Sequence, residues 1–181
     1  MRTMMAMAFA LFFSSVISVH SFAQKEHRQP LNEVQIEKIR EAGVEPDVRI
    51  KLYAQFVGEH VETIKGLTPR IRSSARAKRM DDELQDLTTL MDELGSNLDQ
   101  YGERKADLRK SLKSLSEQTK QWLETLKAIP NEQGFDLSRK EAVESGKDLA
   151  DQVAQMLKEQ TEYFDLHKDE KGQERAEPKQ Q

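Results

Sequence analysis

Cysteine does not occur among the 181 residues, which excludes disulfides, thiolate nucleophiles and metal sites held by cysteine. Glycine (8 residues) and proline (5 residues) are scarce, so phosphate-binding loops and the dense turns of all-β folds have little raw material. Only 6% of the side chains are aromatic, whereas 33% are charged. This balance is typical of a single soluble domain built from amphipathic helices, and it argues against a multidomain enzyme.

Charge and motif content narrow the function further. The chain carries 28 Lys and Arg against 32 Asp and Glu, a formal net charge of −4 that argues against a general nucleic-acid binder. It has no nucleophile elbow, Gly-rich phosphate loop or paired carboxylates in an apolar setting. His27, His60 and His167 fall in separate predicted elements, and Glu59-His60-Val61-Glu62 lacks the HExxH spacing. We therefore expect no enzyme, no metal site and no cofactor.

The first 23 residues have the pattern of a cleavable export signal. Arg2 precedes an apolar run that extends to Val19, and small residues stand at Ser21 and Ala23. The apolar stretch is interrupted by serines and falls short of the roughly 20 residues that span a bilayer, which disfavours an uncleaved anchor. We expect cleavage after Ala23, a periplasmic or secreted location, and no transmembrane segment in the mature chain.

Prolines and capping residues divide the rest of the chain into helices. Glycine ends the first two predicted helices, at Gly43 and Gly66. Thr68-Pro69 and Ser138 with Glu141 have the form of helix starts. The sequence therefore predicts a flexible segment over 24–31, one helical domain over 32–167 with helices at 32–42, 47–65, 69–129 and 139–167, and a disordered polar tail over 168–181.

A heptad pattern dominates the segment after Pro69. With Leu84 at position a, the a and d positions remain apolar as far as Ile129, apart from Lys105 and Thr119. A 3.5-residue repeat without a phase slip predicts one continuous coiled-coil-like helix from Pro69 to Ile129, about 90 Å long. The expected fold is thus all-α, with elongated antiparallel helical hairpins built on this helix. A break at Gly95-Ser96-Asn97 would instead give a compact four-helix bundle.

The long stripe carries the first prediction about function. Two helices alone cover such a stripe poorly, so its distal half is expected to bind a second copy or another protein. The residues predicted to form this self-association seam are Leu94, Leu98, Tyr101, Leu108, Leu112, Leu115 and Trp122.

A second candidate site is a basic stretch. No acid occurs between Lys65 and Met80, and Arg72, Arg76 and Arg79 follow i, i+4, i+7 spacing off the heptad stripe. On a helix their guanidinium groups would share one exposed face and could bind lipid headgroups, envelope polymers or an acidic partner. Alternatively, this is a solvated face neutralised by the acids around it.

Three functions remain open from the sequence. The first is an exported, non-enzymatic structural or protein-interaction module. The second is a chaperone of the holdase type, because the expected hairpins resemble periplasmic holdases in general shape; that function needs exposed Met and Leu surface. The third is an envelope-binding protein that acts through the arginine face, for which binding would be sensitive to salt.

Overall fold

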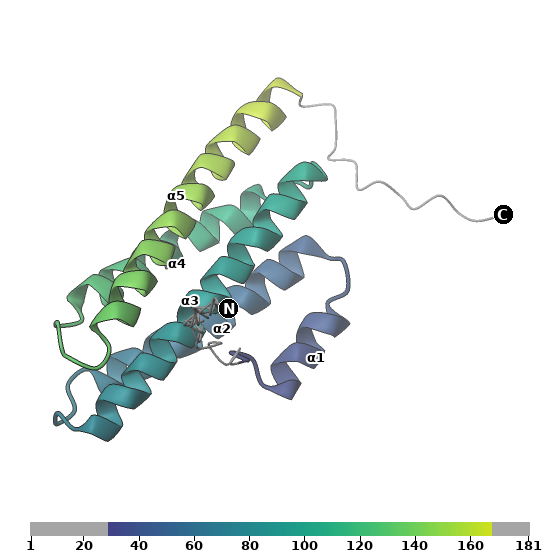
Figure 1. The fold of residues 1–181 in the computed structure, drawn as a ribbon. Helices are drawn as coiled ribbons and strands as arrows, with labels where there is room; N and C mark the ends of the chain where they lie inside the picture. Colours follow the sequence, from purple (N-terminus) through teal and green to yellow (C-terminus); the bar gives the residue numbers. More distant parts are fainter. Residues whose placement is uncertain (1–28, 168–181) are drawn as a thin grey trace, which may run out of the picture.

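The computed structural model describes residues 29–167, and within that range it contains five helices and no strand (Figure 1). The leader over 1–23, most of the 24–31 segment and the tail over 168–181 lie outside the described residues. The helices are α1 (Glu33–Glu41), α2 (Pro46–Leu67), α3 (Ser74–Glu103), α4 (Arg109–Ala128) and α5 (Asp136–Leu166). The all-α prediction is confirmed.

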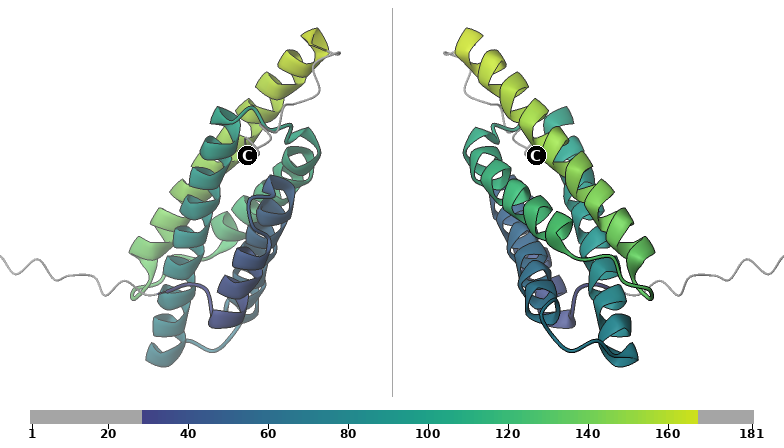
Figure 2. Two further views of the ribbon diagram at one scale, coloured as in Figure 1. Left: turned by 90° about the vertical axis from the view of Figure 1, so that its right-hand side faces the viewer. Right: turned by 90° about the vertical axis from the view of Figure 1, so that its left-hand side faces the viewer.

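Helices α2 to α5 form a four-helix bundle made of two antiparallel hairpins, α2 with α3 and α4 with α5 (Figures 1 and 2). The hairpins pack side by side, so that α5 lies along α3 and α4 lies along α2. The α3–α5 pair is parallel, because Ser145 bonds Asp92 and Gln152 bonds Asp99 further along both helices. The alternative fold from the sequence, a compact bundle, is thus the one observed.

The predicted continuous helix from Pro69 to Ile129 is wrong, because α3 ends at Glu103 and the chain reverses over residues 104–108. Lys105 adopts φ +55°, its N–H bonds the Gly102 carbonyl at 3.0 Å, and the Ala106 N–H bonds the Tyr101 carbonyl at 3.2 Å. This is a Schellman C-cap with lysine in the left-handed position that glycine usually occupies. Each of α3 and α4 carries its own apolar stripe, and the connection happens to keep the heptad phase.

The helix also does not break at Gly95-Ser96-Asn97, which lies inside α3. Helix α5 packs closely there: a Cβ on Gly95 would meet Gln152 Oε1 at 2.9 Å, and the Gln152 amide donates to the Gly95 carbonyl at 3.0 Å. At Gly102, a Cβ would lie 3.3 Å from Met156 Cε. The two glycines thus let the side chains of α5 approach the backbone of α3.

Two helix starts differ from the prediction for local reasons. Thr68 belongs to the end of α2, since its hydroxyl donates to the Ile64 carbonyl at 2.9 Å, and the N-cap of α3 is Ser73, which accepts from the Arg76 N–H at 3.2 Å. Ser138 lies within α5, and its buried hydroxyl bonds Asp81 on α3. Residues 68–73 are therefore a loop at one end of the bundle.

Among the helices of residues 29–167, α1 packs against α2 alone. Asn32 and Gln35 form a capping box at its start, with both hydrogen bonds at 3.0 Å. Arg49 of α2 donates to the carbonyls of Ile39 at 3.1 Å and Gly43 at 3.3 Å, which ties the end of α1 to the bundle.

Candidate functional site

The predicted self-association seam forms the core of the bundle. All seven residues are buried, with at most 6% of any of them exposed: Leu94, Leu98, Tyr101, Leu108, Leu112, Leu115 and Trp122. The other helices of the same chain cover them. The reason for expecting self-association through these residues, a stripe left uncovered, is therefore wrong, because α3 and α4 face each other across a four-helix core.

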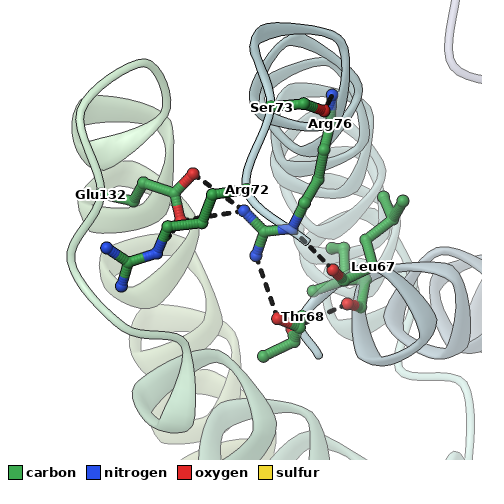
Figure 3. Close-up of polar contacts among 7 residues, drawn as sticks. Leu67, Thr68, Arg72, Ser73, Arg76 and Glu132 are labelled. Atoms are coloured by element: carbon green, nitrogen blue, oxygen red, sulfur yellow. Dashed lines mark hydrogen bonds and ion pairs between the residues drawn. The ribbon is translucent and has the colours of Figure 1, made fainter. Parts of the chain in front are cut away.

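The second candidate site, the arginine run, lies where the α2–α3 loop meets the α4–α5 loop (Figure 3). Arg76, in the first turn of α3, is only 6% exposed. Its Nε donates to the Leu67 carbonyl at 2.8 Å, and Nη2 donates to the Thr68 carbonyl at 3.0 Å. Nη1 reaches both carboxylate oxygens of Glu132, each at 2.9 Å.

Arg76 therefore fastens three segments together: the end of α2, the start of α3 and the α4–α5 loop. The carbonyls that it binds belong to the last turn of α2 and the residue that follows, where the helix itself supplies no donors. Its guanidinium also lies over the ring of buried Phe135, with 5.8 Å to the centroid. The prediction that Arg76 lies on an exposed anion-binding face is wrong, because these acceptors take it into the interior.

Arg72 and Arg79 do lie at the surface, as predicted, but Arg72 is not part of the helix that carries Arg76 and Arg79. Arg72 precedes α3, so helical spacing does not apply to it, and 74% of its side chain is exposed. Its Nε lies 3.5 Å from Glu132, and the Nε of Arg79 lies 3.9 Å from Glu83. Both contacts are long and both arginine side chains are largely exposed, so these ion pairs hold them weakly.

Two further residues join this surface that the sequence did not single out. Ile71 is 90% exposed at the middle of the loop. Arg70 beside it donates to the Gly66 carbonyl at 3.1 Å, and no carboxylate of residues 29–167 forms an ion pair with it. We call Arg70, Ile71, Arg72 and Arg79 the basic end. Three of them, Arg70, Ile71 and Arg79, line a shallow hollow together with neighbours that include Leu67, Pro69 and Ala75.

One sequence signal could have located the basic end. Ile71 falls between Pro69 and a pair of serines, of which Ser73 is a good N-cap, so the segment could have been assigned to a loop rather than a helix. An apolar residue that lies between two arginines in a loop is expected to remain exposed to solvent, because the loop does not pack into the core. Glu132 gives no such signal, since it meets Arg76 only through the tertiary fold.

The acids close to the basic end are already engaged. Glu132 serves both Arg76 and Arg72. Lys140 lies 2.6 Å from Asp136, and its hydrogen bond, together with the weaker effect of Arg139, lowers the pKa of that carboxyl. Glu132 and Asp136 therefore each have a cation beside them.

The histidines are dispersed as the sequence indicated. His60 Nδ1 lies 2.9 Å from Glu83, and His167 Nδ1 lies 2.8 Å from the Tyr163 carbonyl, whereas His27 is outside the described residues. No group of three or more His, Asp or Glu side chains within residues 29–167 is arranged to hold a metal ion.

None of the helices over residues 29–167 combines the length and apolar character required to cross a bilayer. No protein-family model matches the chain, and neither the curated proteins nor the solved structures include a significant match to it.

Proposed function

We propose that this chain is an exported, non-enzymatic binding protein that attaches to an anionic component of the cell envelope through its basic end. The observation that carries the proposal is the placement of Arg70, Arg72 and Arg79 on one end of a molecule whose net charge is −4. A local excess of arginine on an acidic chain attracts anions at that end while the rest of the surface repels them.

The way the loop is held supports this function. Arg76 fixes the loop against the α4–α5 connection, so the exposed arginines project from an ordered base (Figure 3). A fixed loop loses little conformational entropy when it binds, which favours recognition by a few side chains. The leader pattern over residues 1–23 supports export, since a signal of this kind directs a chain out of the cytoplasm.

The other two functions receive less support. A holdase needs exposed Met and Leu surface, whereas Met80, Met91 and the leucines of the stripe are buried. An interaction module that binds through the stripe would first have to open the bundle.

Retention on a heparin column at increasing salt tests the proposal, with the chain from Gln24 onward, which retains every described residue. The triple variant Arg70→Gln, Arg72→Gln, Arg79→Gln should elute at clearly lower salt than the wild type. The matched control removes three exposed basic side chains at the other end of the bundle by Lys51→Gln, Arg104→Gln and Lys110→Gln. The proposal fails if the two triple variants elute together, because binding would then depend on total charge alone.

A further inference from the structure

We propose that the anionic surface is a lipid bilayer, and that Ile71 inserts into it between Arg70 and Arg72. This inference rests on the proposed function, because it identifies the ligand of the basic end. It depends on two features that occur together: the exposed aliphatic side chain of Ile71, and the arginines on both sides of it.

The exposure of Ile71 is the first observation. Ile71 is the most exposed large apolar side chain among residues 29–167, at 90%, whereas the fold buries most of the others. Exposing this apolar side chain to water does not stabilise the protein. A soluble polyanion would bind the arginines without covering the isoleucine. A bilayer does both, since its hydrocarbon takes up the aliphatic side chain while its headgroups meet the guanidinium groups.

The geometry of the loop is the second observation. Residues 68–73 connect two antiparallel helices and therefore form the tip of a hairpin (Figure 1). Pro69 restricts the backbone just before Arg70, and Arg76 anchors the base of the loop to Leu67 and Thr68. The tip is therefore presented outward with no further ordering required.

The surroundings of the tip are the third observation. The α4–α5 loop lies at the same end of the bundle (Figure 2), and just after it Leu137 is 70% exposed. Leu137 is a second aliphatic side chain at the end that would face the membrane. Arg79 lies in the second turn of α3, behind the loop, where it would remain at the level of the headgroups.

The expected binding is weak and reversible. Each arginine near an anionic membrane strengthens partitioning about fivefold. One partly buried isoleucine adds roughly tenfold. Together these make a contact that salt weakens strongly and that depends on the content of anionic lipid.

Vesicle sedimentation tests the inference. The probes are vesicles of phosphatidylcholine with about one-third phosphatidylglycerol and vesicles of phosphatidylcholine alone, a composition chosen so that only the first carries the surface charge that attracts basic residues. The wild type should bind the first and not the second. Ile71→Asn should weaken binding roughly tenfold. The matched control is Val44→Asn, which removes another exposed aliphatic side chain (78% exposed) at the opposite end of α2 and should bind like the wild type.

The absence of cysteine allows a direct measurement of insertion. Ile71→Cys, labelled with an environment-sensitive fluorophore, should shift to shorter wavelength and resist an aqueous quencher when anionic vesicles are added. The same label at Val44→Cys should not respond.

The outcomes separate this inference from the proposed function. If Ile71→Asn retains full vesicle binding, or if the label at position 71 stays exposed to water, insertion is refuted even when the arginine variants lose retention on heparin. If the wild type is retained on heparin but does not bind anionic vesicles, the ligand is a soluble or polymeric anion and the bilayer inference is wrong. If the arginine triple variant matches its control in both assays, both proposals fail.

Discussion

Replacing Arg76 with alanine should unfold this bundle at a much lower temperature. The substitution removes hydrogen bonds to the Leu67 and Thr68 carbonyls and the paired contact with Glu132. Removing one partner of a buried ion pair costs about 3–5 kcal/mol. Because Arg72 still lies 3.5 Å from Glu132, we expect a value near the lower limit, about 3 kcal/mol. For a domain of this size, that corresponds to a fall in Tm of about 10 °C.

Thermal and urea denaturation followed by circular dichroism at 222 nm would measure this change. The matched control is Arg79→Ala, which removes another arginine from the same stretch of α3. Its contact with Glu83 is long and the Arg79 side chain is largely exposed, so the loss should be below about 0.5 kcal/mol. In a Glu132→Ala background, Arg76→Ala should cost less than in the wild type, because the pair is already broken. If Arg76→Ala and Arg79→Ala lower Tm equally, the assignment of Arg76 as a structural clamp is wrong.

Three other predictions concern the α3–α4 connection. Lys105→Gly should stabilise the fold by about 1 kcal/mol, because glycine adopts positive φ without strain; an unchanged or lower free energy of unfolding would contradict the reported turn. Gln160→Ala removes two side-chain hydrogen bonds from α5 to this connection, at 2.8 and 2.9 Å, and should cost about 2 kcal/mol, whereas Gln155→Ala on the surface of α5 should cost almost nothing. Two hydrogen bonds from Arg109 lower the pKa of Asp107 below its usual 3.8. The ionised carboxylate therefore stabilises the fold above about pH 4, and this contribution is lost as the pH falls through the lowered pKa. In urea titrations between pH 2 and pH 5, the free energy of unfolding should therefore fall less steeply with decreasing pH in Asp107→Asn than in the wild type.

The sequence predicted the elements that depend on local pattern. The second helix was expected over 47–65 and is found at Pro46–Leu67, because its apolar residues recur at helical spacing and Pro46 suits a first turn. The heptad positions of α3 and α4 were correctly predicted to form an apolar stripe, but this stripe is buried in the core of the bundle and not between copies of the chain. Periodicity predicts which face of a helix is apolar and therefore buried. It does not predict whether helices of the same chain or of another molecule cover that face.

The partner itself could not be predicted, because heptad phase does not record a chain reversal. The turn at Lys105 keeps the phase of the stripe and uses no glycine or proline, so none of the usual breakers marks it. Gly102 lies nearby, but it faces Met156 rather than capping the helix. Because this reversal was missed, the sequence predicted a rod whose apolar stripe needed a second copy or another protein to cover it.

The arginines of the basic stretch were misjudged for a related reason: a helical wheel places Arg72 and Arg76 together, whereas the loop separates them. Arg76 finds buried acceptors because α2 ends beside it and the α4–α5 loop brings Glu132 to the same place. Arg72 and Ile71, outside the helix, keep their side chains in solvent. Residues close together in the sequence therefore have different roles: Arg76 stabilises the loop, and the loop exposes Ile71 for binding. Substitutions of Ile71 should therefore change binding without changing Tm, and Arg76→Lys should lower Tm while leaving the charge of the basic end intact.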